Sequence, residues 1–302
     1  MNAQILSALD IMHRKELHAR NTFKANAYAK VIAAMKEHPP IHSIDDTKDI
    51  KGLGDGIRKK IAEILETGHL AAAEQTTEQN AAFKAHELFL KVYGVGPAKA
   101  KELVDAGMRT LSDLEKAKLN AKQLIGVRYY HDLLERIPRA EVAEHERIIA
   151  KAFAKADAVQ VVGSYRRGAH TSGDVDVLIK GLSQAELKAA LNTLRDSGYV
   201  HETLAEGPKK FMGIARTNAT SVARRIDILL TPEDEFAYAL LYFTGSDKFN
   251  VAMRRHALTL NWSLNEHGLS AMKDNKAAPP TLLTEAAIFE FLGMEYRAPE
   301  ER

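Results

Sequence analysis

The sequence predicts a multidomain protein that is helical in its first half and mixed α/β in its second half. In the first half, apolar residues recur every three or four positions, which is the period of an amphipathic helix. The clearest of these stretches are residues 26–36, 58–66 and 81–93. In the second half, short β-branched runs alternate with helical patterns, as in a domain whose helices pack on a sheet. The runs are 159–162, 175–179 and 225–230, and the helical patterns are 184–194 and 236–243.

The composition excludes several classes of protein. With 302 residues, of which 45% are hydrophobic, the chain can bury more than one core and is not a disordered or fibrous protein. The formal charge is only +2, so any nucleic-acid surface must be local. Because the chain has no cysteine, disulfides, thiolate nucleophiles and Cys-ligated metals are excluded. No apolar stretch approaches the ~20 residues of a membrane span, so we expect no membrane partner and a soluble intracellular protein of the cytoplasm, nucleoid or nucleus.

Four breaks in the pattern mark candidate boundaries or hinges. They are Pro39-Pro40, the polar run Glu74–Asn80, the turn Arg136–Arg139 and Thr231-Pro232. We expect a small helical domain before about residue 80 and a larger body after it.

A short motif occurs twice, 42 residues apart: Lys51–Gly54 matches Tyr93–Gly96, and a helical pattern follows each copy. An apolar residue between two glycines lets the backbone turn tightly and approach a partner closely, while the following helix points its N–H groups at the same place. Such an arrangement binds a phosphate backbone without reading bases. The alternative is an ordinary turn with a glycine cap, but two copies in one chain favour DNA binding through Gly52, Gly54, Gly94, Val95 and Gly96.

The second half contains three aspartates with a metal-binding pattern. Side chains alternate along a strand, so Asp174 and Asp176 project from one face while Val175 enters the core. Asp227 lies in a second strand-like run, and if the two strands are neighbours the three carboxylates converge. They would suffice for two Mg²⁺ ions about 3.5–4 Å apart, the arrangement that serves phosphoryl transfer. The alternative is that each aspartate is a solvated strand-end residue.

Just upstream, Gly163-Ser164 ends an apolar strand and is followed by Arg166 and Arg167. Backbone N–H groups, a hydroxyl and two guanidinium groups are donors suited to triphosphate oxygens. Together with the Asp-X-Asp pattern, they predict nucleotidyl transfer.

These residues resemble a known family. The stretch Gly163–Ile179 is similar to the nucleotidyltransferase signature of the family X DNA polymerases, on the pattern of DNA polymerase beta, and Tyr242–Asn250 resembles that family's nucleotide-pocket segment. The resemblance covers essentially the whole chain. It implies a 5′-end-binding, lyase-like domain with the first helix-hairpin-helix at 1–79 and a DNA-binding subdomain with the second at 80–127. A nucleotidyltransferase palm with a mixed sheet would occupy 128–233, and a small α+β nucleotide-selection subdomain 234–302.

The resemblance also implies residue roles. Asp174 and Asp176 would bind both metals, and Asp227 would bind the catalytic metal and help activate the primer 3′-hydroxyl. The nucleotide would be held by Gly163, Ser164, Arg167, Gly173, Tyr242, Phe243, Gly245, Asp247 and Asn250. Core packing is the alternative for the aromatic pair. Arg225 and Arg254 would contact DNA.

A second activity is implied for the N-terminal domain. Crowded ammonium groups lower one another's pKa, so one lysine can attack an aldehyde. The family's 5′-deoxyribose-phosphate lyase uses such a Schiff base, and the matching nucleophile is Lys60, with Lys24, Tyr28 and Lys59 on the DNA-binding surface. The alternative is that these lysines only bind the downstream 5′-phosphate.

Three positions depart from the vertebrate enzyme's pattern. Gly56 replaces a basic residue near the 5′-phosphate, Leu229 replaces an arginine that changes partners during closure, and Leu124 replaces another arginine near the triphosphate.

The expected function is gap-filling DNA synthesis in base excision repair, with dNTP and gapped or nicked duplex DNA as partners. We expect Mg²⁺ as the cofactor, with Mn²⁺ as an alternative, and a monomeric chain. Two other functions remain open: a template-independent nucleotidyltransferase and a non-catalytic DNA-binding scaffold.

Overall fold

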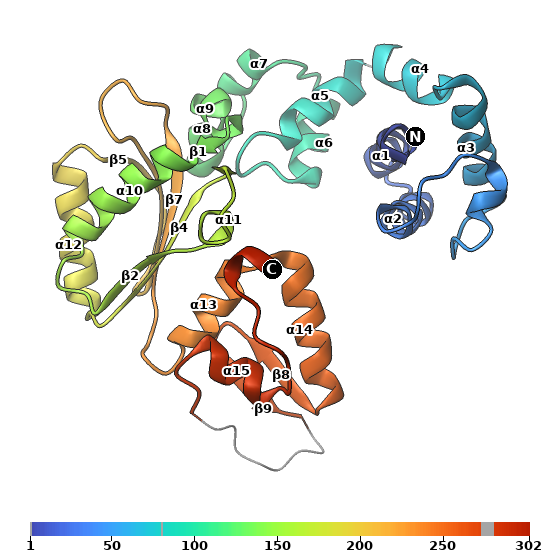
Figure 1. Ribbon diagram of the computed structural model, residues 1–302. Coiled ribbons are helices and arrows are strands. Elements are labelled where there is room, and N and C mark those ends of the chain that lie inside the picture. Colours follow the sequence, from blue (N-terminus) through green and yellow to red (C-terminus); the bar gives the residue numbers. More distant parts are fainter. Residues whose placement is uncertain (1, 80, 273–280) are drawn as a thin grey trace. The chain divides into compact units, whose positions relative to one another are not determined.

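The computed structural model describes residues 2–79, 81–272 and 281–302, and the chain divides into two compact units, Met1–Val127 and Arg128–Arg302 (Figure 1). Helices build the described part of the first unit, and a mixed sheet with helices builds most of the second. The fold class expected from the sequence is therefore confirmed.

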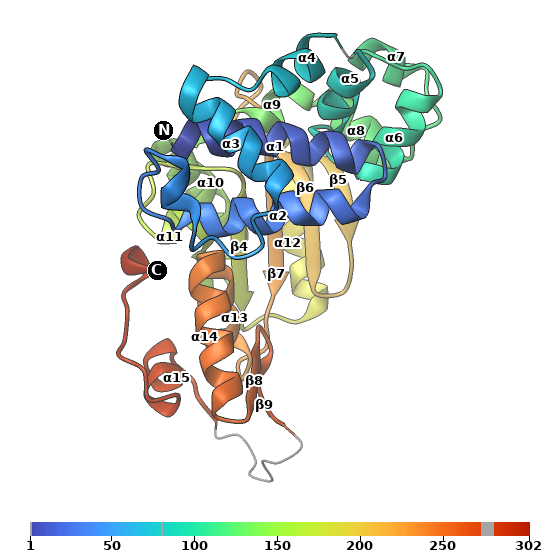
Figure 2. The same cartoon turned by 90° about the vertical axis from the view of Figure 1, so that its right-hand side faces the viewer.

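The first unit begins with three helices around an aliphatic core, and α1 and α2 lie side by side (Figure 2). The elements are α1 (Asn2–His18), α2 (Thr22–Lys36), the 3-10 helix η1 (Ile44–Thr47) and α3 (Asp55–Thr67). Ile5 and Leu9 of α1, Val31 of α2 and Ile61 of α3 have no exposed surface. Burial of this apolar face, rather than helix propensity alone, stabilises the three helices.

Shorter helices complete the first unit. They are α4 (Ala71–Gln79), α5 (Ala81–Leu90), α6 (Pro97–Asp105), α7 (Leu111–Glu115) and α8 (Ala121–Arg128), whose last residue belongs to the second unit. Within the polar run Glu74–Asn80, which the sequence marks as a candidate boundary, α4 continues to Gln79, because alanine, glutamate and glutamine favour helix. Asn80 lies outside the described residues. Arg14 of α1 contacts Glu87 of α5, which joins the two groups of helices.

The second unit contains a five-stranded mixed sheet in the order β2-β4-β7-β6-β5, in which β4 and β7 are parallel and the other pairs antiparallel. Its strands are β2 (Ala158–Val161), β4 (Val175–Lys180), β5 (Val200–Glu206), β6 (Lys210–Ala215) and β7 (Arg224–Leu230). A short pair, β1 (Ile137–Pro138) and β3 (Thr171–Ser172), lies beside it, and the connecting helices are α9 (Tyr130–Leu134), α10 (Arg139–Ala152), α11 (Gly163–Arg166) and α12 (Gln184–Asp196). The expected turn Arg136–Arg139 is thus a strand followed by a helix start, since Ile137 and Pro138 pair with Ser172 and Thr171.

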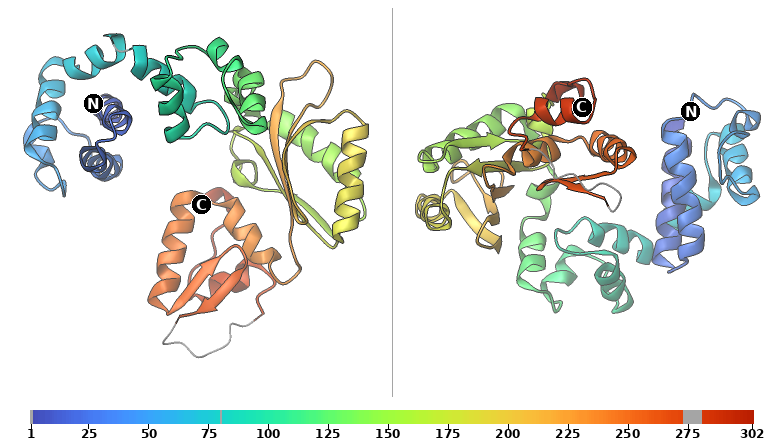
Figure 3. Two further views of the ribbon diagram at one scale, coloured as in Figure 1. Left: turned by 180° about the vertical axis from the view of Figure 1, so that it is seen from behind. Right: turned by 90° about the horizontal axis from the view of Figure 1, so that it is seen from below.

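The two faces of the sheet have different roles. Helices α10 and α12 cover one face (Figures 1 and 3), where Val175, Val177 and Ile226 join a core shared with both helices. On the other face, Leu178 of β4 packs with Ala239 of α13 (Phe236–Thr244), the helix that follows β7. Alternation along β4 and β7 directs Asp176 and Asp227 to this second face.

The remaining residues form a small α+β part. It consists of α13 (Phe236–Thr244), α14 (Asp247–Thr259), β8 (Trp262–Asn265), β9 (Gly268–Ala271), α15 (Glu285–Phe291) and the 3-10 helix η2 (Pro299–Glu301). No described helix combines the length and apolar character needed to cross a bilayer.

Candidate active site and nucleic-acid interface

Two of the three expected metal-binding aspartates are direct neighbours. Asp176 of β4 and Asp227 of β7 are register partners on adjacent parallel strands, so their side chains leave the same face of the sheet side by side. Both line a small pocket with Lys210 of β6. Burial and the neighbouring Asp227 carboxylate raise the pKa of Asp176 to about 6.

Gly163 lies against this pair. Its φ is +61°, a conformation that glycine adopts readily and other residues rarely do, and a Cβ there would lie 3.3 Å from Asp176 Oδ2. The chain that leaves β2 therefore runs directly past the carboxylate. Oxygen ligands crowded in this way suit a hard divalent cation, because the cation offsets both the burial and the repulsion from Asp227 that raise the Asp176 pKa.

The third aspartate is held indirectly. Arg225 of β7 contacts Asp174 and donates a 2.7 Å hydrogen bond to Asp227 Oδ2, so one guanidinium bridges two of the expected metal ligands. Within the described ranges, no three acidic or histidine side chains are grouped closely enough to form a ready-made metal site. The structure thus brings Asp176 and Asp227 together and links Asp174 to Asp227 through Arg225, a residue that the sequence assigns to DNA.

The two arginine side chains of the expected phosphate loop have different hydrogen-bond partners. Arg167 donates to the backbone carbonyl of Thr244, whereas Arg166 donates two hydrogen bonds, of 3.0 and 2.7 Å, to the Glu285 carboxylate. Ser164 Oγ donates to Ser172 Oγ at 3.0 Å. The loop is therefore fastened both to β3 and to the C-terminal part of the unit.

A cleft of about 500 Å³ opens in front of this loop. It is lined by Gly163, Arg167, Asp176, Tyr242, Phe243, Gly245, Ser246, Asp247, Lys248 and Asn250. Seven of the nine expected nucleotide-binding residues are among them; Ser164 and Gly173 are the other two. Pockets that combine aromatic surface with a few placed polar groups are typical of ligand sites.

The aromatic pair faces the cleft instead of being fully buried. Tyr242 and Phe243 are half-buried and meet edge to face, with ring centres 5.2 Å apart. Asn250, in the next helix α14, donates from Nδ2 to the Tyr242 carbonyl at 2.7 Å. Arg254 follows one turn later on α14 and is exposed.

Sequence reasoning missed two basic residues here. A Cβ on Gly173 would lie 3.2 Å from an Arg136 guanidinium nitrogen, so Arg136 stands beside the phosphate loop, where it donates to the Thr171 carbonyl at 2.7 Å. Lys210 lies close enough to Asp176 to oppose the rise in its pKa. The sequence predicts a turn at Arg136, and nothing in the local pattern around Lys210 indicates that β6 adjoins β7.

The two glycine motifs of the first unit have the same local geometry. Gly52 and Gly94 have φ of +85° and +81°, and Gly54 and Gly96 are the extended residues directly before α3 and α6. No described atom lies within 4 Å of a Cβ built on Gly52, Gly54 or Gly96, so these backbones are open to a partner. In the second copy, Gln123 of α8 donates to the Gly94 carbonyl at 3.1 Å. Val95 between the glycines is 6% exposed and supports the turn from inside.

Profiles of known families match the chain in four consecutive segments. A helix-hairpin-helix domain matches residues 1–70, the fingers domain of DNA polymerase lambda 87–134, the DNA polymerase beta palm 136–233 and the DNA polymerase beta thumb 239–302. The chain belongs to the family X DNA polymerases. The resemblance found in the sequence motifs is confirmed.

Family X relatives match most or all of the chain. DNA polymerase lambda of Rattus norvegicus is 37% identical over 100% of this chain and 56% of its own length, and DNA polymerase lambda of Arabidopsis thaliana is 33% identical over 91% and 57%. DNA nucleotidylexotransferase of Xenopus laevis is 27% identical over 100% of this chain and 68% of its own length. The chain thus spans a little over half the length of the two polymerase lambda relatives.

The lysine surface of this family X chain lies on α2 and α3. The side chains of Lys24 and Lys59 are exposed. Lys60 Nζ donates a solvent-exposed hydrogen bond of 3.2 Å to the Gly56 carbonyl. Tyr28 differs, because it is only 6% exposed and its ring packs in the helical core. One residue that the sequence did not single out is Phe23, which is 85% exposed at the start of α2, next to Lys24.

Proposed function

We propose that this chain is a repair-type, template-directed DNA polymerase that adds a dNTP to a primer 3′-hydroxyl in short gaps. The observation that carries the proposal is the Asp176–Asp227 pair, which stands beside a 500 Å³ cleft and a phosphate loop. Nucleotidyl transfer needs anionic ligands for cations and cationic donors for phosphates within one site. The polymerase relatives of the chain support the same reading.

The residues present fit divalent ions. Asp174, Asp176 and Asp227 would hold them, since all their donors are carboxylate oxygens and since a cation would offset the burial and the like charge that raise the pKa of Asp176. Bound ions would supply positive charge that acidifies the primer hydroxyl and balances the charge of the departing pyrophosphate. We propose Mg²⁺, with Mn²⁺ as the alternative.

The chain's own side chains would position the nucleotide. Arg167, Ser164 and the Gly173 backbone would hold the β- and γ-phosphates, and Arg136 would add a further guanidinium. Tyr242, Phe243 and Gly245 would border the deoxyribose. Asp247 and Asn250 would contact the incoming base from α14, and Arg254 the template strand.

The DNA partner would be gapped or nicked duplex, held by the two helix-hairpin-helix motifs. The glycine turns offer open backbone N–H groups, which suit phosphates of any sequence. Lys24 and Lys59 would add charge on the 5′ side of the gap, with Lys60 as the lyase nucleophile. We propose that one chain suffices for both steps.

One-nucleotide-gapped DNA offered single dNTPs tests the polymerase directly. We expect Mg²⁺-dependent extension by the dNTP that matches the template. Asp227→Ala should abolish extension while DNA binding, measured by fluorescence anisotropy, stays unchanged. Asp234→Ala removes an exposed carboxylate outside the cleft and serves as the matched control. Binding without extension in the wild-type protein would favour the scaffold.

A template-independent transferase is the second candidate, because the chain is 27% identical to a DNA nucleotidylexotransferase. The same assay separates the two functions. Equal incorporation of all four dNTPs opposite every templating base would establish the transferase and reject the polymerase.

The lyase proposal has its own test. Borohydride trapping on a 5′-deoxyribose-phosphate end should be lost in Lys60→Ala and retained in Lys59→Ala, which removes the adjacent ammonium group. An undiminished adduct in Lys60→Ala would reject Lys60 as the nucleophile.

A further inference from the structure

Arg224, the first residue of β7, is buried in the palm with only 2% of its surface exposed. It points to the face of the sheet that α10 and α12 cover, opposite to Asp227, because side chains alternate along the strand. A guanidinium in such a place is costly unless every donor finds an acceptor. Its partners therefore indicate what the burial is for.

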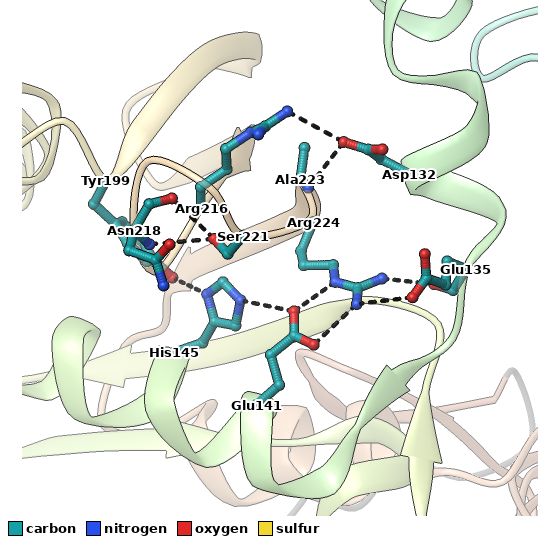
Figure 4. A network of polar contacts seen from close by, with 10 residues as sticks. All are labelled: Asp132, Glu135, Glu141, His145, Tyr199, Arg216, Asn218, Ser221, Ala223 and Arg224. Carbon is teal, nitrogen blue, oxygen red and sulfur yellow. Dashed lines mark hydrogen bonds and ion pairs between the residues drawn. The ribbon is translucent and has the colours of Figure 1, made fainter.

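Glu141 of α10 is the main partner of Arg224 (Figure 4). The guanidinium donates to both Glu141 oxygens, at 2.6 and 2.9 Å, and donates a third hydrogen bond of 2.9 Å to the Glu135 carbonyl. A two-point contact between planar groups fixes orientation as well as distance. Arg224 thus sets where β7 lies along α10.

Glu141 lies beside a buried histidine. His145, one turn further along α10, places Nε2 3.9 Å from Glu141 Oε1, and its Nδ1 is 2.7 Å from the Tyr199 hydroxyl. Tyr199 lies directly before β5. The contacts run from Arg224 through Glu141 and His145 to Tyr199 (Figure 4), which precedes the edge strand β5.

A second set of hydrogen bonds holds Ala223, the residue before Arg224. Asp132 of α9 accepts a 3.0 Å hydrogen bond from the Ala223 backbone N–H and lies 3.3 Å from the Arg216 guanidinium at the end of β6. Two consecutive residues at the start of β7 are therefore held by the segment Asp132–Glu141.

The segment Asp132–Glu141 also reaches the phosphate loop. Ile137 pairs with Ser172, whose hydroxyl accepts from Ser164, and Arg136 donates to the Thr171 carbonyl. This continuous segment of ten residues therefore contacts the start of the strand that carries Asp227 through both of its ends, Asp132 and Glu141. Its middle contacts β3, which adjoins the loop expected to hold the triphosphate.

We propose that Arg224, Glu141 and Asp132 are positioning residues for nucleotidyl transfer: they fix the Asp227 strand relative to the phosphate loop through the segment Asp132–Glu141. The inference rests on the proposed polymerase function. A displacement of ~1 Å between reacting groups can reduce a rate by roughly a hundredfold, so such a restraint affects turnover directly.

The test uses a double variant in the full chain, Arg224→Met with Glu141→Leu. Removing one partner of a buried ion pair destabilises a protein, whereas replacing both by apolar residues of similar size is often neutral. We expect the single variants to unfold at lower temperature and the double variant to regain the wild-type melting temperature. Its kcat on gapped DNA should nevertheless fall roughly tenfold or more, with the KM for dNTP nearly unchanged. The Mg²⁺ concentration for half-maximal rate should rise.

The pair Arg195→Met with Glu206→Leu provides the matched control, because it removes an ion pair between α12 and β5 that does not touch the segment. It should leave kcat at the wild-type value. Asp132→Ala, at a side chain that is 31% exposed, is the second variant and should lower kcat several-fold without a change in fold.

Wild-type kcat in both Asp132→Ala and a stable double variant would overturn the positioning role. If the double variant does not fold, wild-type kcat in Asp132→Ala alone overturns it. Absence of extension by the wild-type protein would instead overturn the proposed function, so the two failures are distinguishable.

Discussion

His145 is a fully buried histidine whose burial lowers its pKa to about 4, while nearby Glu141 and Arg224 act in opposite directions. In the unfolded chain its pKa returns to the ordinary value of 6.5. Between these values the unfolded state binds the extra proton, so stability is fully present above pH 6.5 and is lost as the pH falls toward 4. We expect this one group to remove about 3 kcal/mol from the free energy of unfolding over that interval.

Urea unfolding of wild type and His145→Gln at pH 7.5 and pH 4 measures this contribution. The stability advantage of the wild type over the variant should be about 3 kcal/mol smaller at pH 4, because glutamine does not titrate there. A difference that is the same at both pH values would show that His145 titrates normally.

A second prediction concerns the substitution Gly163→Ala and its effect on stability and primer extension. Alanine there must adopt φ of +61° and place its Cβ 3.3 Å from Asp176 Oδ2. Gly198→Ala is a matched control, because Gly198 has φ of +75° but no described atom within 4 Å of its Cβ. Both variants should lose about 1 kcal/mol of stability from backbone strain. In primer extension, only Gly163→Ala should lose activity, by roughly tenfold or more; a similar loss in Gly198→Ala would attribute the effect to stability.

The elements that carry the site differ in how far sequence could predict them. Strands β4 and β7 are β-branched runs, and alternation within each strand places its aspartate opposite the apolar residues that enter the core. Strand β5 mixes His201, Glu202 and Glu206 into its pattern and buries few residues, so its period is obscured.

Contacts between distant segments could not be predicted from local patterns. The bridge from Arg225 to Asp174 joins residues that meet only once β4 and β7 pair. The pairing of Ile137 with Ser172 likewise cannot be predicted from the four residues 136–139 alone, because the partner strand is distant in the sequence. Taken alone, these four residues have the pattern of a turn. The sequence therefore predicts which residues have metal-binding or phosphate-binding side chains, but not which distant residues those side chains contact.

Helix α15 is joined to the phosphate loop by one buried carboxylate. Burial alone would raise the pKa of Glu285. Hydrogen bonds from Arg166 and Arg302 nevertheless hold this pKa below its usual value. Glu285→Gln removes the charge between two guanidinium groups and should cost about 2–4 kcal/mol of unfolding free energy. Because Arg166 adjoins Arg167, we also expect a higher KM for dNTP.

The ion pair between Lys180 and the exposed Glu233 is the control for this prediction. Glu233 is 63% exposed, so Glu233→Gln should change stability by no more than about 0.5 kcal/mol. Equal losses in the two variants, measured by urea unfolding, would contradict a special role for Glu285.

For the whole molecule, a formal charge of only +2 means that DNA affinity must come from local features. The glycine turns would bind phosphates through neutral N–H groups, whereas lysines would release counterions. Gly54 and Gly96 have φ of −78° and −90°, which valine adopts freely, so Gly54→Val and Gly96→Val block close approach without backbone strain. Each loses about one charge-assisted hydrogen bond, which corresponds to a roughly tenfold weaker affinity for duplex DNA of any sequence.

If both hairpins bind, the double variant should be weaker by roughly a hundredfold, because separate sites add their free energies. Neither valine should change the slope of log affinity against log salt, whereas Lys59→Ala should lower that slope by about 1. Fluorescence anisotropy on two unrelated duplex sequences, with Gly207→Val as the control outside the hairpins, measures all of these. A double variant no weaker than one single variant would show that only one hairpin contacts DNA, and the repeat would then serve folding in its other copy.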